Sequence, residues 1–329
     1  MIVFKLQNKV WYPGMLCALL LFVLPKYSMA QQDVQFSQYI FNGLALNPGY
    51  AGYKEQTNLD VMYRNQWTGL DGAPKTFSAL LDGVSANNSH GFGFQVLNDQ
   101  LGAENNTSAV ASYAYRLKLS ERSRLSFGVS AGLQQYSIDW NKLTETENDL
   151  NRPAGNTSVP RPLMNFGLFY ASDKSFYGLS VTNFLSNYYN DASNLYLSRS
   201  RYYYAQAGTL IGISEELSLK PSFLIREDFK GPTNIDLNLL LVVDKKLTFG
   251  GSYRTGMKIF KKTNLQQNLS ENNAISVMFS LQLKKNLRLG YAYDYSVNHM
   301  NSVSNGSHEI SLGYLFNRKN APVLTPRNL

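Results

Sequence analysis

The stretch LRLGYAYDYS, Leu287 to Ser296, places large residues on every second position, with small or charged residues between them. Because side chains alternate between the two faces of a β-strand, this spacing predicts a strand with Leu and Tyr on one face and polar residues on the other. The pattern needs a strand of about ten residues, whereas strands of soluble domains usually have about five or six. A tilted strand of about ten residues is long enough to cross a bilayer.

The same alternation recurs in SRLSFGVSAGLQ (123–134), AISVMFSLQL (274–283) and EISLGYLF (309–316). Segments of this kind from Leu59 to Phe316 predict about fourteen strands. Their connections alternate in length. Short connections fall at 120–122, 172–174, 215–216, 244–245 and 284–286, and long ones at Ile138–Arg161, Phe184–Ser200, Met257–Asn272 and Val297–Gly306.

Short turns at one end and long loops at the other are typical of an outer-membrane barrel, with the short turns in the periplasm. We therefore expect an all-β fold, a transmembrane antiparallel outer-membrane β-barrel of about 14 strands over residues 57–316, with both termini periplasmic. The alternative is a secreted β-sandwich, which also alternates. Long strands, alternating loop lengths and a Tyr-rich apolar face opposite a Gly- and Ser-rich face favour the barrel.

The N-terminus has the pattern of a secretory signal peptide over residues 1–30. Lys5 and Lys9 precede an apolar run, and cleavage is expected near Ala30. The one cysteine, Cys17, lies inside that run, so no disulfide or thiolate metal site is expected in the mature chain. Residues 31–56 are expected to form a periplasmic N-terminal segment that docks against the barrel mouth or enters the lumen, and residues 317–329 a C-terminal tail.

Charged residues fall on the face opposite the large apolar side chains, because a cation at mid-membrane on the lipid face costs roughly 2 to 4 kcal/mol. Ion pairs that fill the lumen, a charged conduit for a solute and a partner site are three readings of this pattern. The residues are Arg64, Arg116, Lys118, Lys220, Arg226, Arg254, Arg288, Asp60, Asp82, Asp236, Asp294 and Glu309.

No enzyme, cofactor or metal pattern is found in the sequence. GSHE (306–309) sets Ser, His and Glu side by side, but neighbours on a strand point to opposite faces and cannot form a relay. His90 and His299 lie outside any metal-ligand spacing such as H-E-x-x-H. The full chain has a net charge of +8, and the interspersed charges argue against nucleic-acid binding.

Several motifs resemble the PorP/SprF family of outer-membrane proteins of the type IX secretion system. They are QFSQYIFNGLALNPGYAG (35–52), YRNQWTGLDGAPKTFSALLDG (63–83), VLNDQLGAENN (96–106), YAYRLKLS (113–120), GYAYDYS (290–296) and GSHEISLGYLF (306–316). The chain departs from the family at its end, which is TPRNL rather than an aromatic residue.

The resemblance implies a non-enzymatic component that supports export or surface placement of a specific cargo, such as a gliding-motility adhesin. The implied partners are outer-membrane lipid, type IX secretion components and a large secreted cargo protein. A small-solute channel is the alternative. The motif positions, expected to serve partner contact or barrel structure, are Gln35, Phe36, Gln38, Tyr39, Asn47, Pro48, Gly52, Arg64, Trp67, Gly72, Ala73, Pro74, Asp82, Gly306, Ser307, His308 and Glu309.

Overall fold

The computed structural model describes residues 34–143, 155–188, 200–260 and 274–316. The expected signal peptide with Cys17, its cleavage site near Ala30 and the expected C-terminal tail lie outside the described residues. The strands are β1 (Thr57–Asn65), β2 (Lys75–Val84), β3 (His90–Leu101), β4 (Glu104–Ser120), β5 (Ser123–Asp139), β6 (Asn156–Ala171), β7 (Ser175–Thr182), β8 (Tyr202–Thr209), β9 (Ile211–Gly212), β10 (Leu217–Glu227), β11 (Thr233–Val243), β12 (Leu247–Met257), β13 (Ala274–Lys284), β14 (Leu287–Ser296) and β15 (Ser307–Phe316).

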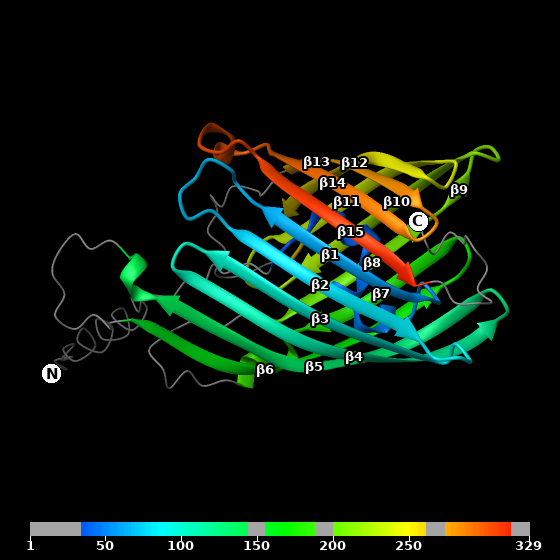
Figure 1. Ribbon diagram of the computed structural model, residues 1–329, viewed down its shortest axis with the longest axis horizontal. Coiled ribbons are helices and arrows are strands. Elements are labelled where there is room, and N and C mark those ends of the chain that lie inside the picture. Colours follow the sequence, from blue (N-terminus) through cyan, green and yellow to red (C-terminus); the bar gives the residue numbers. More distant parts are fainter. Residues whose placement is uncertain (1–33, 144–154, 189–199, 261–273, 317–329) are drawn as a thin grey trace, which may run out of the picture. The chain divides into compact units, whose positions relative to one another are not determined.

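The strands form one closed antiparallel wall (Figure 1). Each strand pairs with its neighbours in the chain, β1 pairs with β15, and β10 pairs with both β8 and β11. β8 and β9 are separated only by Leu210 and both pair with β10, so they act as one wall strand and the barrel has 14 strands. The prediction of an antiparallel barrel with about fourteen strands is confirmed.

Alternate side chains of each strand point outward and inward. On β2, Phe77 and Leu81 are exposed on the outer surface, whereas Ser78 and Leu80 between them are buried inside. The outer surface is a band of Leu, Phe, Tyr, Val and Ile side chains, which suits the hydrocarbon of a bilayer. Closure pairs the backbone groups that an open sheet would leave at its edges, where each costs several kcal/mol in hydrocarbon.

The connections differ at the two ends of the barrel. One end has turns of a few residues, such as 121–122, 172–174 and 285–286, and the other has the long loops 140–155, 183–201 and 258–273. These are called the short-turn end and the long-loop end below. The tight connection 102–103 is an exception at the long-loop end.

The expected loop Ile138–Arg161 is wrong at both of its ends. β5 continues to Asp139 and β6 begins at Asn156, and the two strands stay paired over this length. The segment contains Pro160, and proline removes a ladder donor, which makes a strand here unexpected. β6 tolerates it because its ladder with β7 begins only at Phe166.

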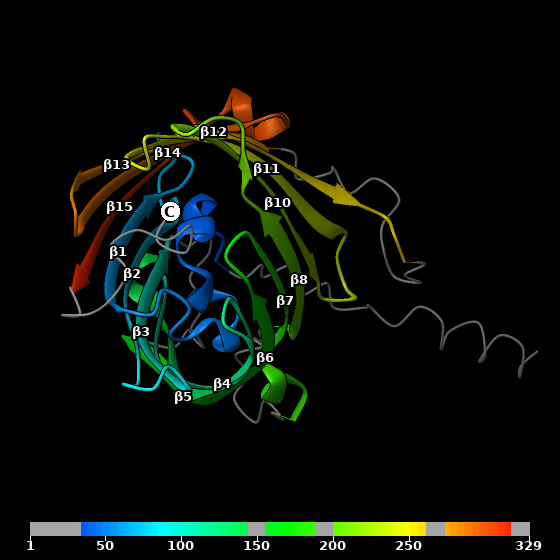
Figure 2. The same cartoon turned by 90° about the vertical axis from the view of Figure 1, so that its right-hand side faces the viewer.

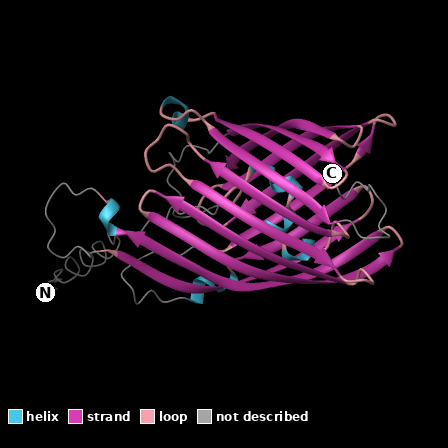
Figure 3. Ribbon diagram, in the orientation of Figure 1, coloured by secondary structure: helices cyan, strands magenta, loops and turns pink. Residues whose placement is uncertain are grey.

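Six short 3-10 helices complete the described fold (Figure 3). Among the described residues no helix has the length and apolar character needed to cross a membrane. The 3-10 helices are η1 (Ser37–Phe41), η2 (Gly43–Ala45), η3 (Pro48–Tyr50), η4 (Trp140–Lys142), η5 (Phe184–Tyr188) and η6 (His299–Ser302).

The segment Val34–Gln56, called the plug below, lies inside the barrel. Figure 2 shows it in blue, surrounded by the strands. Two of its three 3-10 helices contact strands on opposite sides of the wall: η1 contacts β13, β14 and β15, and η3 contacts β4, β5, β6 and β7. Of the two placements expected for this segment, the structure shows the one in the lumen.

Candidate functional site

The plug runs through the lumen from one end towards the other. Val34 lines a cavity that Thr182 and Asn234, at the long-loop ends of β7 and β11, also line. Gly52 lies against Gly83 and Gly91, at the short-turn ends of β2 and β3. The chain then leaves the lumen and begins β1 at Thr57. The described N-terminal chain therefore enters from the long-loop side and exits at the short turns.

A buried carboxylate, Glu309 of β15, holds the beginning of η1. Its Oε2 accepts a hydrogen bond from the backbone N–H of Ser37 and its Oε1 one from the N–H of Gln38, both at 2.9 Å. These N–H groups belong to the first turn of a 3-10 helix, where no carbonyl within the helix can accept from them. A carboxylate supplies two acceptor oxygens at once. Glu309 is fully buried and is thus the acceptor for the helix start.

Arg64 of β1 completes this cluster. Its guanidinium lies 3.1 Å from Glu309 and 2.6 Å from Asp294 of β14. The Ser37 hydroxyl donates to Asp294 at 2.7 Å. Arg64 and Glu309 are also register partners across the β1–β15 ladder. One cation and two carboxylates therefore join the plug to three adjacent strands, and the two motif residues on the wall, Arg64 and Glu309, meet each other there.

Gln38 extends the contact one step along the lumen. Its amide nitrogen donates to the Glu309 backbone carbonyl at 3.2 Å, and its amide oxygen accepts from the Ser311 hydroxyl at 2.7 Å. Gly290 on the adjacent strand β14 is the register partner of Ser311, and a Cβ there would lie 2.3 Å from the Gln38 amide oxygen. The small residue between Leu289 and Tyr291 in LRLGYAYDYS therefore leaves room for the side chain of Gln38.

A second group of glycines receives the Asn47–Pro48–Gly49 turn. The Asn47 amide donates to the carbonyls of Leu168 on β6 and Leu179 on β7, at 2.9 and 3.2 Å. Its oxygen accepts from the Gly49 N–H at 2.8 Å, which caps η3. A Cβ on the wall glycines would overlap the turn. The two closest approaches are 2.1 Å from Gly128 to the Gly49 nitrogen and 2.0 Å from Gly167 to the Asn47 amide oxygen.

Ionic contacts hold the plug where it leaves the lumen. Asp60 of β1 pairs with Lys54 of the plug at 3.1 Å and with Arg288 of β14 at 2.7 Å. Asp82 of β2 accepts from the N–H of Gly52 at 3.1 Å. Gly52 has a φ of +75°, a conformation that favours glycine.

Apolar side chains of the plug form three clusters with the wall. Leu44, Tyr50 and Ala51 pack with Leu80, Ala114, Phe169 and Ala171; Tyr39 packs with Tyr202, Tyr204 and Leu224; and Phe41 packs with Leu240, Met278 and Ala292. The Tyr39 hydroxyl accepts from the Asn238 amide at 2.7 Å. Each cluster contains residues from both plug and wall, so the lumen has a core rather than a lining of charges alone.

The remaining lumen charges are only partly explained by ion pairs between strands. Arg254 and Asp236 form a bidentate pair at 3.0 and 3.1 Å, and Arg116 pairs with Glu55 of the plug at 3.3 Å. Lys118 was expected on the lumen face, but its side chain is 49% exposed beside the 121–122 turn and pairs with Glu121. β4 extends beyond the lumen at this end, so a side chain on its inward face meets solvent rather than other lumen residues.

The motif residues of the β1–β2 loop lie at the long-loop end, against the start of β15. The Trp67 N–H donates to the Ser307 hydroxyl at 3.1 Å, and the Thr68 N–H donates to the Gly306 carbonyl at 2.8 Å. Trp67 has a φ of 52°, which its bulky side chain rarely adopts. Gly72, Ala73 and Pro74 belong to the same loop: the Gly102 N–H donates to Gly72, the Ala73 N–H to Leu70 and the Gln66 N–H to Pro74.

The Ser-His-Glu stretch does not form a relay. Ser307 and Glu309 are buried on the lumen side, whereas the His308 Nδ1 lies 2.8 Å from the Tyr291 hydroxyl among exposed aromatic residues. Within the described part of the chain, no group of three or more His, Cys, Asp or Glu side chains could hold a metal ion.

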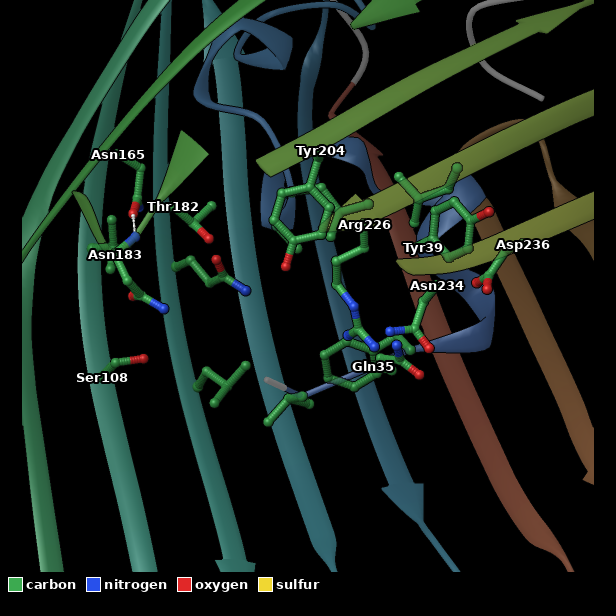
Figure 4. Close-up of a pocket in the computed structure, with 18 of the residues that line it drawn as sticks. Gln35, Tyr39, Ser108, Asn165, Thr182, Asn183, Tyr204, Arg226, Asn234 and Asp236 are labelled. Atoms are coloured by element: carbon green, nitrogen blue, oxygen red, sulfur yellow. Dashed lines mark hydrogen bonds between the residues drawn. The ribbon is translucent and has the colours of Figure 1, made fainter. Parts of the chain in front are cut away.

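A cavity of about 100 Å³ lies beside the plug towards the long-loop end (Figure 4). Gln35, Phe36 and Tyr39 of the plug form one wall. Side chains of β3, β4, β6–β8 and β10–β12 and of Asn183 form most of the rest, and the Asn183 N–H donates to the Asn165 amide oxygen at 2.8 Å. The lining combines apolar, amide and charged groups.

The sequence model of the family described as "Type IX secretion system membrane protein PorP/SprF" matches residues 28–314. The chain belongs to the PorP/SprF family. It is thus a membrane component of the type IX secretion system, and its barrel is of the outer-membrane kind. No curated protein matches the sequence.

Three solved structures with a similar fold are distant in sequence. "CymD monoaromatic hydrocarbon channel" has 12% identity and a TM-score of 0.48, covering 85% of this chain and 94% of that one. A FadL homologue of Pseudomonas aeruginosa has 11% identity and a TM-score of 0.46, with 83% and 93% covered. Omp33 of Acinetobacter baumannii has 9% identity and a TM-score of 0.46, with 80% and 98% covered. Such values carry no argument about function.

Sequence reasoning missed several residues that hold the plug. Ser37 and Lys54 looked like ordinary polar residues, and Gly128, Gly167 and Gly290 like the small residues of a lumen face. The available signal was that glycines recur at inward positions of successive strands, where a wide aqueous lumen would accept any polar side chain.

Proposed function

We propose that this PorP/SprF protein is a non-enzymatic accessory that supports export or surface placement of a specific type IX cargo, such as a gliding-motility adhesin. The observation that carries this proposal is the plug. It crosses the lumen from the long-loop end to the short-turn end and is bonded to the wall by Glu309, Asp82 and the Asn47 turn. A solute channel would have to release these contacts, which favours a barrel that acts through its surfaces.

The proposed orientation has the short turns in the periplasm and the long loops outside the cell, as is usual for outer-membrane barrels. In this orientation the described chain ends on the periplasmic side at Phe316 but begins towards the exterior at Val34, so the expectation of two periplasmic termini fits only the end of β15. In this orientation the β1–β2 loop and the start of β15 face the exterior. The motif residues there, Trp67, Gly72 and Gly306 among them, are proposed as structural supports of the exterior surface and as contacts for the cargo or for other secretion components.

A deletion strain tests the proposed function. Loss of surface display of one large protein, while unrelated type IX substrates still leave the cell, is the expected result. Loss of all such substrates together would instead place the protein in the core machinery. Normal secretion with impaired uptake of a solute would overturn the proposal and favour a channel.

A complementation series separates the barrel from its outer surface. A plasmid copy with Trp67→Ala, at the β1–β2 loop, should restore barrel insertion but not cargo display if this loop contacts a partner. A copy with Lys245→Ala, in the turn 244–246 at the other end, serves as the control and should restore both.

A further inference from the structure

The outward faces of β3, β4 and β5 change character at one level of the sheet. The last apolar row is Val96, Ala109 and Leu133, which are register neighbours across the three strands. Below it the outer surface carries exposed aromatic side chains such as Phe94 and Tyr113. On β3, β4 and β5 this row marks the end of the apolar band, whereas on β2 the band continues to Phe77, the register partner of Asn98.

Two rows of amide and hydroxyl side chains follow beyond that boundary. Asn98, Thr107 and Gln135 are register neighbours in the first row, and Gln100, Asn105 and Ser137 in the second. They lie on the outer face because they share strand parity with the lipid-facing residues. These six residues are called the amide face.

The strands here are long enough to carry the amide face beyond the membrane. β4 and β5 have 17 residues each, whereas a tilted strand of about 10 residues crosses the hydrocarbon. The extra length lies towards the long-loop end, where β4 starts at Glu104 and β5 ends at Asp139. The amide face is therefore at the level of the lipid headgroups or just above them.

Side-chain hydrogen bonds hold the amide face in a fixed arrangement. The Asn98 amide nitrogen donates to the Asn105 amide oxygen at 2.7 Å and to the Thr107 hydroxyl at 2.8 Å. The Ser137 hydroxyl donates to the Asn105 backbone carbonyl at 3.2 Å. A merely solvated strand surface needs no such ordering and usually carries charges of both signs.

The chemistry of this face indicates its partner. Phosphate groups select Lys and Arg, and an apolar protein surface selects large side chains, whereas none of the six residues is charged or large and apolar. Amides and hydroxyls both donate and accept hydrogen bonds, as sugar hydroxyls do. Neighbouring strands are about 4.8 Å apart and alternate residues about 6.8 Å apart, so the grid of polar groups has the scale of a sugar ring.

The alternative partner is a strand of another protein that pairs with the edge of the wall next to the amide face. The residues of that edge do not favour such pairing. β6 continues beyond its ladder with β7, and this extension carries Pro160 and Pro162. Proline lacks the N–H that a pairing strand would need, and its presence protects edges.

We propose that the amide face binds the saccharide headgroup of a glycolipid that surrounds the barrel. The lipid tails lie on the apolar band and the sugars lie on the two polar rows directly above it. This inference goes beyond the role in secretion and does not depend on the cargo, but it rests on the proposed orientation, in which the long-loop end faces the outside of the cell.

The test measures binding to the purified full chain, folded in detergent micelles. The two probes are a lipopolysaccharide with its core oligosaccharide and the same lipid A without sugars. Asn105→Leu combined with Gln135→Leu should weaken binding of the saccharide-bearing probe about tenfold, because two hydrogen-bonding side chains are lost, and should leave lipid A binding unchanged. Asn105→Gln combined with Gln135→Asn keeps both amides and should bind like the wild type.

Heat-dependent migration on gels checks that each variant forms a barrel, and the single variant Gln135→Ala replaces the leucine pair if that pair does not fold. Equal affinity of the wild type for both probes would overturn the proposal. Equal affinity of the leucine and wild-type proteins for the saccharide-bearing probe would overturn it as well.

Discussion

Replacement of Glu309 by Gln tests whether the buried carboxylate holds the plug in the lumen. The carboxylate accepts from two backbone N–H groups at 2.9 Å each and pairs with Arg64 at 3.1 Å. A glutamine side chain has one carbonyl oxygen, and its NH₂ group would face one of the two N–H donors. One plug N–H then loses its acceptor inside the protein.

The cost follows from these contacts. A buried donor without a partner costs about 1 to 3 kcal/mol, and hydrogen bonds to charged groups are at the upper end of the range. Arg64 keeps Asp294 at 2.6 Å, so the loss is smaller than that of an isolated buried pair. We expect plug docking to weaken by about 2 to 3 kcal/mol, which is a rise of roughly 30- to 140-fold in the undocked population.

Hydrogen–deuterium exchange on the folded barrel measures this population. The backbone amides of Ser37 and Gln38 should exchange roughly 30 to 140 times faster in Glu309→Gln, provided that exchange follows the opening equilibrium. The amides of the wall should keep their protection. Glu121→Gln is the matched control, since the Glu121 side chain is 85% exposed in a turn. Unchanged exchange of the two plug amides in a folded Glu309→Gln barrel would refute the reasoning.

Three further predictions concern packing, topology and the second anchor. Gly128→Ala places a Cβ 2.1 Å from a plug nitrogen and should lower the thermal unfolding midpoint, because overpacking costs about 1 to 3 kcal/mol. The control Gly212→Ala meets nothing within 4 Å and should leave the midpoint unchanged. Equal midpoints for the two variants would contradict this reasoning. On intact cells an impermeant maleimide should label Lys142→Cys but not Lys245→Cys, and the reverse pattern would invert the proposed orientation. Asn47→Ala removes both hydrogen bonds to the wall carbonyls and should raise the rate of proteolysis of the plug in purified barrels. A rate equal to that of the wild type would contradict the role of Asn47 as an anchor.

The barrel was predictable from the sequence because each of its rules is local. Alternation over Leu287–Ser296 identifies a strand and its lipid face, and β14 has those bounds in the structure. Loop lengths identify the two ends. The start of β6 was missed because the cost of Pro160 depends on whether a neighbouring strand needs its N–H, and that neighbour, β7, is too short to reach it.

The plug contacts were not predictable to the same degree. Inward parity places Glu309 in the lumen, but its partners are backbone N–H groups 271 and 272 residues away, and every non-proline residue offers such a group. The motif resemblance brought Gln38, Arg64 and Glu309 into one set, whereas only the fold shows that they touch. Ser37 carried no signal of its own, since its role depends on where the η1 helix happens to start.

The Arg64–Glu309 contact also has a consequence for how the barrel is built. These residues lie 245 positions apart and face each other across the β1–β15 seam, the last ladder in which the two ends of the barrel sequence meet. Bringing such distant segments together has a high entropic cost, which their contacts must offset. The plug is made before every strand and bonds to both sides of the seam. We therefore expect closure of the barrel and docking of the plug to be coupled, so that a chain without the plug closes its β1–β15 seam less stably.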